Sequence, residues 1–210
     1  MANPAYLRGN ARAIYSPMSI IDISAHGGLD YHFGSVATVM GFPSADAEYG
    51  DDAAMNALWE EGNHSSATGW HAGASVTLKA KAGPLIVMLN GDMTHWNVNA
   101  EDNVEGDWYF EREQELMLAL GGGQVLSLNG IFLYEIDRDL SDGASLRVGN
   151  LTTRRTSIAA EDELLRTGLL AIWTRNEHFS HILTVQPYLR DRAFTSAMPP
   201  FVGYIVKYQR

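Results

Sequence analysis

The sequence predicts an all-β fold, an up-and-down antiparallel β-barrel of about ten strands, within a range of about eight to twelve. Three observations predict it. Apolar and polar residues alternate with a period of two in several successive runs. Turn signals rich in glycine and proline separate the runs. Short and long connections alternate through the first six runs, as expected for a barrel whose two rims differ.

The totals limit the alternatives. At 210 residues the chain suits one domain, residues 1–210. No stretch approaches the roughly 18 uninterrupted apolar residues of a transmembrane helix. The net charge of -10 argues against a nucleic-acid partner, and the lack of cysteine excludes disulfides and thiolate chemistry. No signal peptide precedes the first strand-like segment. We therefore expect either a mature chain with an added Met1 or a cytosolic protein, and favour the first.

Alternation is clearest in five runs between residues 21 and 135. Each run separates apolar from polar side chains across a strand. The apolar faces carry Ile21, Ile23, Ala25, Leu29, Tyr31 and Phe33; Ala72, Ala74, Val76 and Leu78; Leu85, Val87, Leu89 and Met93; Trp108, Phe110, Leu116, Leu118 and Leu120; and Leu126, Leu128, Phe132 and Tyr134. The polar faces carry Asp22, Ser24, His26, Asp30 and His32; His71, Ser75, Thr77, Lys79 and Lys81; Asn90, Asp92 and Thr94; Tyr109, Glu111, Glu113 and Glu115; and Ser127, Asn129 and Glu135.

The remaining strands are weaker. We predict them near Ser145–Thr156, Leu164–Thr174, His181–Arg190 and Phe201–Tyr208. Short turns are expected at Ser16-Pro17-Met18, Ala82-Gly83-Pro84 and Gly121-Gly122-Gly123, and long connections at 34–69, 97–106 and 137–143. The first long connection has an Asp51–Glu61 segment with Met55, Leu58 and Trp59 at helical spacing, which predicts a short helix.

Alternation alone does not say which face lies inside, because a soluble lipocalin-like barrel also alternates and turns its apolar face inward. The aromatic residues favour a membrane barrel, since they fall at the strand ends nearest the long connections and would form a belt at the membrane interface. This belt comprises Tyr31, Phe33, Trp70, Trp96, Trp108, Phe110, Phe132 and Tyr134. The polar face has both charge signs, as a wet or salt-bridged lumen would. Its predicted lining is Arg8, Arg12, Asp22, His26, Asp30, Lys79, Lys81, Asn90, Asp92, Glu111, Glu113, Glu115 and Asn129.

The last ten residues carry a third indication. Gly203, Val206 and Tyr208 resemble the C-terminal targeting signal of bacterial outer-membrane β-barrel proteins, although the chain continues through Gln209 and Arg210 rather than ending on an aromatic residue. The resemblance implies a location in the bacterial outer membrane, with the lipid bilayer and lipopolysaccharide as partners. It also implies that both termini lie at the rim of short turns. A ten-strand count instead places both at the rim of long connections.

Three groups of residues could carry chemistry. His32, His71 and His95 fall at one rim of adjacent strands, but parity points His95 to the opposite face, so we predict no metal site. His178 and Ser180 resemble the His-x-Ser arrangement of outer-membrane lipid A deacylases, over a tripeptide only. A third group consists of carboxylates that could share protons, although we favour ion pairs with nearby cations. The acids are Asp92, Glu111, Glu113 and Glu115, and the cations are Arg8, Arg12, Lys79 and Lys81.

The preferred hypothesis is an outer-membrane β-barrel with a polar lumen, which either passes small solutes passively or is plugged. It needs no cofactor and no catalytic residue. One alternative is an outer-membrane enzyme with its site at the long-connection rim. The other is a soluble lipocalin-like barrel that binds a hydrophobic small molecule.

Overall fold

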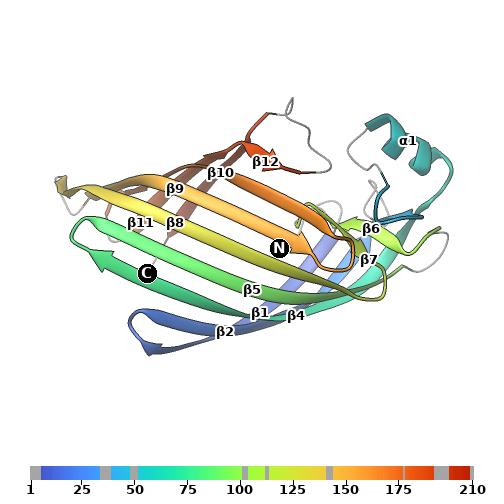
Figure 1. Cartoon of the computed structure of the whole chain (residues 1–210), viewed down its shortest axis with the longest axis horizontal. Coiled ribbons are helices and arrows are strands. Elements are labelled where there is room, and N and C mark those ends of the chain that lie inside the picture. Colours follow the sequence, from blue (N-terminus) through green and yellow to red (C-terminus); the bar gives the residue numbers. More distant parts are fainter. Residues whose placement is uncertain are drawn as a thin grey trace.

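The long strands form one curved antiparallel sheet in the computed structural model (Figure 1). The structure describes residues 6–33, 39–47, 52–100, 104–111, 114–140, 144–176, 178–191 and 199–208. Its elements are β1 (Tyr6–Met18), β2 (Ile21–Phe33), β3 (Val39–Phe42), α1 (Asp52–Glu60), β4 (His64–Ala82), β5 (Leu85–Ala100), β6 (Trp108–Glu111), β7 (Leu116–Ala119), β8 (Gly123–Leu140), β9 (Ala144–Ser157), β10 (Asp162–Thr174), β11 (Phe179–Gln186), β12 (Tyr188–Arg190) and β13 (Phe201–Tyr208). Among these residues no helix is long and apolar enough to cross a membrane.

The predicted all-β, antiparallel hairpin architecture is confirmed. The main sheet runs in the order β1, β2, β4, β5, β8, β9, β10, β11, β13, and every neighbouring pair is antiparallel. The strand predicted at Phe201–Tyr208 is β13 with the same bounds, and the predicted short helix is α1. The connection that leads to β4 is shorter than predicted, because β4 begins at His64 and β3 forms within the connection.

The segment predicted as a fifth strand, from Trp108 to Leu120, is not part of the main sheet. It forms the hairpin β6–β7. In the main sheet β5 pairs directly with β8, in a ladder that runs from Leu85 opposite Tyr134 to Trp96 opposite Gly123. The reason is that consecutive side chains from Leu116 to Leu118 are all 0% exposed. A strand with one face in solvent or lipid buries only every second residue, so this segment must be enclosed on both faces.

The two ends of the sheet differ. At one end, here called the loop rim, β2, β5, β9 and β11 end and β4, β8, β10 and β13 begin. At the other end, here called the turn rim, β1, β4, β8 and β10 end and β2, β5, β9 and β11 begin. The long connection predicted at 137–143 is wrong, because β8 continues to Leu140 and β9 starts at Ala144. Since one predicted strand leaves the sheet, β1 and β13 both run from the loop rim to the turn rim. Tyr6, where β1 begins, therefore lies at the loop rim and Tyr208, where β13 ends, lies at the turn rim, so the two do not share one rim as the ten-strand count predicted.

The sheet is open. Among the described residues β1 pairs only with β2 and β13 only with β11, so these two strands are its edges. The hydrophobic core lies at the loop rim, where β6 and β7 pack on the face of the sheet that carries Trp96, Val98, Val125 and Leu164. A second cluster joins Met40, Phe42, Met117 and Ala160 beside it. We call β6, β7 and the turn between them the plug.

Candidate functional site

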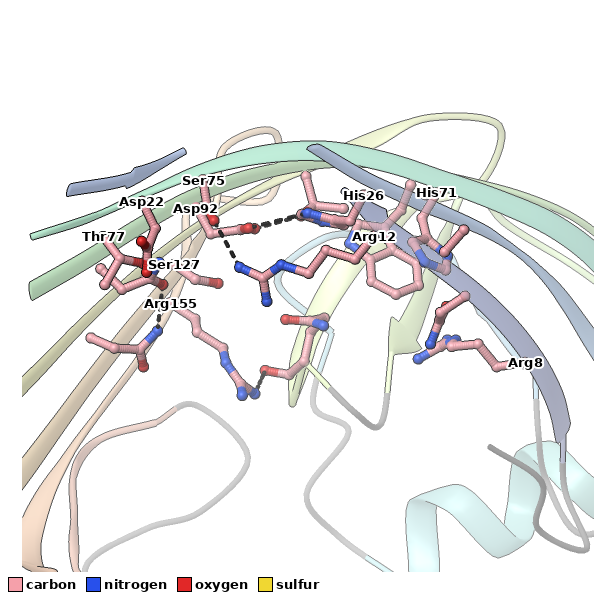
Figure 2. Close-up of a pocket in the computed structure, with 18 of the residues that line it drawn as sticks. Arg8, Arg12, Asp22, His26, His71, Ser75, Thr77, Asp92, Ser127 and Arg155 are labelled. Atoms are coloured by element: carbon pink, nitrogen blue, oxygen red, sulfur yellow. Dashed lines mark hydrogen bonds and ion pairs between the residues drawn. The ribbon is translucent and has the colours of Figure 1, made fainter. Parts of the chain in front are cut away.

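A polar cavity lies on the concave face of the sheet, next to the plug. Its volume is about 640 Å³, and Figure 2 shows the sheet arching over the side chains that border it. Seven residues of the predicted lumen lining border this one cavity: Arg8, Arg12, Asp22, His26, Asn90, Asp92 and Asn129. The cavity also has Ser75, Thr77, Thr94 and Ser127, and Gln114 reaches it from the plug.

Two histidines border the cavity, one on β2 and one on β4, and each lies opposite a glycine of the other strand. His26 lies opposite Gly73 and His71 lies opposite Gly28 in the antiparallel register. A Cβ atom at Gly73 would lie 2.7 Å from His26 Nε2, and one at Gly28 would lie 2.7 Å from the His71 ring. Backbone carbonyl oxygens lie closer still, that of Met93 at 2.6 Å from the Cβ position of Gly73 and that of Gly9 nearer yet to the Cβ position of Gly28. A side chain at either position would therefore displace both the imidazole and the neighbouring backbone.

His26 belongs to a closed triangle with Thr94 and Asp92. The Thr94 hydroxyl donates to Asp92 Oδ1 over 2.6 Å, and His26 Nε2 lies 3.0 Å from Thr94 Oγ1. His26 Nδ1 lies 3.6 Å from Asp92 Oδ2. Because the hydroxyl proton is committed to Asp92, Nε2 must carry a proton and donate to Thr94. This imidazole nitrogen cannot act as a base toward Thr94, so the triangle does not generate a nucleophile.

His71 belongs to a buried charged cluster nearer the plug. His71 Nδ1 lies 2.8 Å from Asp30 Oδ2, and the Arg8 guanidinium forms an ion pair with Asp30. Arg8 also lies 3.4 Å from Glu111 of the plug and stacks on the Trp96 ring at 4.6 Å. The side chains of Arg8 and Asp30 are 2% and 0% exposed. Such charges are tolerated away from water only when they are paired and hydrogen bonded.

Polar contacts hold the plug against the far wall. Glu115, which has a positive φ of 57° in the turn of the plug, accepts from Arg166 at 2.8 Å and from the Tyr188 hydroxyl at 3.1 Å. These bonds stabilise a backbone conformation that is unfavourable for a residue with a side chain. Asp162 accepts the Met117 amide at 2.8 Å. Burial, with Glu111 and Asp30 nearby, raises the pKa of Tyr109 well above its usual value, so this plug residue remains a neutral phenol.

The predicted carboxylate cluster does not form among the described residues. Asp92 pairs with His26, Glu111 with Arg8, and Glu115 with Arg166. The two predicted lysines also pair separately: Lys79 with Asp22 at 2.6 Å and Lys81 with Glu135 at 2.9 Å. Glu113 lies outside the described residues. Of the four cations predicted to pair with this group of acids, Arg8 does so, through Glu111. The two lysines pair with other carboxylates, and Arg12 contacts hydroxyl groups.

The other candidate chemistry is not assembled either. His95 lies against Trp70, ring centroids 5.2 Å apart, on the face opposite to His71, as parity predicts. Within the described ranges, no three His, Cys, Asp or Glu side chains come together as a metal site. The Ser180 hydroxyl lies 3.2 Å from Thr174 Oγ1. His178 lies in the preceding turn, where its amide donates to Asn176 Oδ1.

The predicted aromatic belt is wrong in part. Trp96 is 4% exposed on the concave face, and it stacks on His71 with ring centroids 4.6 Å apart. Trp108 and Phe110 pack against the second core cluster. Tyr31, Phe33 and Trp70 are exposed near the loop rim, whereas Phe132 and Tyr134 are exposed near the turn rim. Further exposed aromatics gather at the turn rim: Tyr15, Trp173, Phe179 and Tyr208.

The convex face between these aromatic groups is mainly apolar and exposed. It carries Ile23, Val76, Leu78, Leu89, Met93, Leu128, Leu169 and Leu183. One polar patch interrupts it on β9 and β10, where the hydroxyls of Thr152 and Thr167 lie 2.7 Å apart. Nearby, Arg154 pairs with Glu163 at 2.6 Å. The weak alternation of these two strands in the sequence has its structural counterpart in this patch.

Comparison with known proteins adds no relative. The chain matches no family model, no curated protein and no solved structure. The geometry therefore carries the functional argument alone. Sequence inspection did not single out the concave contacts of Trp96, Ser75 and Thr94. One available signal was the motif His-x-Gly at 26–28 and again at 71–73, which pairs reciprocally once β2 and β4 are antiparallel.

Proposed function

We propose that the chain is an outer-membrane β-sheet protein whose polar cavity is closed at the loop rim, so that it holds a small solute rather than conducting freely. The observation that carries the proposal is the distribution of polarity. The exposed convex face is mainly apolar, and the part of the concave face that borders the cavity is polar and carries both charge signs. A water-soluble sheet would place these faces the other way round.

The distance between the two aromatic groups supports the proposal. Trp70 lies opposite Asn97 of β5, and Phe132 lies opposite Val87 of the same strand. A ten-residue separation spans roughly 33 Å along a strand, or about 25 Å along the membrane normal for a tilt of about 40°. Outer-membrane barrels have an apolar band about 25 Å tall between two aromatic girdles.

The plug supports the closed form. Tyr109, Leu116 and Leu118 pack with Val98, Val125 and Leu164 in a buried hydrophobic cluster on the concave face. An ion path along that face would have to cross these buried apolar side chains. The preferred branch of the sequence hypothesis is therefore a plugged barrel, with passive entry of solutes limited to the polar cavity.

A bilayer location requires that the two sheet edges be covered, because an unpaired backbone group in lipid costs several kcal/mol. The proposal therefore includes closure between β1 and β13. Both strands run from the loop rim to the turn rim, so the closing pair would be parallel. The polar patch on β9 and β10 is tolerated because its side chains bond to one another.

The geometry supports the alternatives less well. A lipocalin-like carrier needs its apolar face inward, whereas most of the exposed large apolar side chains of this sheet lie on its convex face. An enzyme at the loop rim needs an activated nucleophile, which the Thr94 and Ser180 contacts do not supply.

The test is recovery with and without detergent. The chain should accumulate as inclusion bodies, refold only in detergent or lipid, and migrate differently on a denaturing gel when boiled and unboiled. A soluble, monodisperse protein in plain buffer would refute the membrane proposal.

A further inference from the structure

Arg12 is the cavity cation that reaches across three strands. It extends from β1, with Nη2 2.8 Å from Ser24 Oγ of β2 and 3.2 Å from Ser75 Oγ of β4. Its Nε lies 3.1 Å from Ser24 Oγ. The two serines lie opposite each other in the register, and their hydroxyl oxygens are 2.7 Å apart. The cluster is therefore built by strand pairing and does not depend on a loop.

Hydrogen-bond donors exceed acceptors in this cluster. A guanidinium has five N–H donors and each hydroxyl has one, whereas the two hydroxyl oxygens together accept about four bonds. At least three donors therefore remain for a partner from the cavity, and the guanidinium adds a full positive charge. Such a group of donors suits an oxyanion, which is an acceptor only.

The neighbouring carboxylates are engaged elsewhere. Asp22 accepts from Lys79 at 2.6 Å and from Ser16 at 2.7 Å. Asp92 accepts from Thr94 and faces His26. Asp30 is paired with Arg8 and His71, deeper beside the plug. Among the described residues, the hydrogen bonds of Arg12 go only to the hydroxyl groups of Ser24 and Ser75, and Asp22 interacts with it through charge alone, in contrast to the close ion pair of Arg8 with Asp30.

A second guanidinium borders the same space. Arg155 lines the cavity from β9 and donates to the Gln114 carbonyl at 3.1 Å. Figure 2 shows the Arg12 and Arg155 side chains pointing into the hollow beneath the arched sheet. A ligand on Arg12 would therefore meet positive charge from two sides, which strengthens binding of an anion.

We propose that Arg12, Ser24 and Ser75 bind the oxyanion group, phosphate or carboxylate, of a small solute in the polar cavity. The inference deepens the proposed function by naming the class of solute, and it rests on that function only in requiring a water-accessible cavity. The volume of about 640 Å³ lies within the range of about 300–1,000 Å³ typical of small-molecule sites. The cavity can therefore hold an organic anion as well as inorganic phosphate.

The test uses the full chain refolded in detergent, titrated calorimetrically with inorganic phosphate and with acetate at constant ionic strength. Chloride is the ionic-strength control. Arg12→Gln keeps a side chain that can bond to the serines but removes the charge. We expect it to weaken binding about tenfold to a hundredfold, the equivalent of one charge-assisted interaction. The matched control is Arg154→Gln, which removes an arginine from the convex face and should bind as the unaltered chain does.

The outcomes separate the hypotheses. Tighter binding of phosphate or of acetate identifies which oxyanion the cluster prefers. Absence of saturable binding to both in the unaltered chain overturns the inference, as does equal binding by Arg12→Gln. The boiled and unboiled gel bands, recorded on the same samples, report whether each variant is folded. A chain that binds phosphate yet is soluble without detergent would refute the membrane proposal and leave the anion site standing.

Discussion

Val76 and Thr77 are adjacent β-branched residues of β4 that face opposite sides of the sheet, so they test the location of the lipid directly. Val76 is 47% exposed on the convex face, and Thr77 borders the polar cavity. Val76 lies six residues from Trp70, which is roughly 15 Å along the membrane normal for a strand tilted by about 40°. That depth is near the middle of an apolar band about 25 Å tall.

Arginine at this depth on a lipid-facing position costs about 2–4 kcal/mol. The folded-to-unfolded ratio of Val76→Arg should therefore fall by roughly 30-fold to 1,000-fold relative to the unaltered chain, because about 1.4 kcal/mol corresponds to a factor of ten. Thr77→Arg places the same side chain in the polar cavity and should change the ratio far less. On a water-exposed sheet, Val76→Arg would stay within about 0.5 kcal/mol.

The assay is urea titration of each variant refolded into vesicles of a defined lipid, followed by tryptophan fluorescence and by the boiled and unboiled gel bands. Equal free energies of unfolding for Val76→Arg and the unaltered chain would refute the argument that the convex face meets lipid. A larger loss for Thr77→Arg than for Val76→Arg would reverse the assignment of the two faces.

Three further predictions concern the plug, the sheet edges and the buried ion pair. Replacement of residues 104–120 by a short Gly-Ser linker should convert a non-conducting protein into a conducting one in planar bilayers; a folded variant without conductance would show that the plug is not the barrier. The chain has no native cysteine, so Ala11→Cys in β1 combined with a cysteine at Val202, Tyr204 or Val206 in β13 should form an intrachain disulfide in at least one pair, whereas Ala72→Cys with Tyr204→Cys should not. Disulfide-linked dimers would mean that a second copy covers the edges. Asp30→Asn should lower the free energy of unfolding by about 3 kcal/mol, because it removes the carboxylate charge that is paired with the buried Arg8. Asp22→Asn, at a partly exposed pair, should have a much smaller effect, and equal effects would contradict the role assigned to burial.

Period-two alternation was enough to predict most of the strands. The side chains of Val76 and Thr77, or of Leu89 and Asn90, differ in polarity at every step, and a strand with two unlike faces is the simplest structure that separates them. Seven predicted lining residues border one cavity for the same reason. Residues that lie opposite each other on neighbouring strands share a face of the sheet, so the polar faces of successive strands join into one surface.

The plug escaped prediction because local pattern and tertiary environment disagree there. Trp108 and Phe110 alternate with Tyr109 and Glu111 as a sheet strand would, yet β6 pairs with β3 and β7 instead of joining β5. Only contacts with Val98, Val125 and Leu164, distant in sequence, decide that this segment is enclosed on both sides. That decision also changed the rim on which β13 ends, and it removed Trp108 and Phe110 from the aromatic belt. Trp96 left the belt for another reason, because it shares the concave face of β5 with Asp92 and Thr94.

The sequence by itself determined the all-β class, the antiparallel hairpins and the parity of most strands, because these depend on the side-chain period and on local turn chemistry. Tertiary structure alone decided the exit of β6 and β7 from the sheet, the parallel course of the two edge strands β1 and β13, and the convergence of Arg12, Ser24 and Ser75. These features depend on which strands become neighbours and in what register. The neighbours and the register of each strand depend on contacts between residues far apart in the chain, so they cannot be predicted from a local sequence pattern.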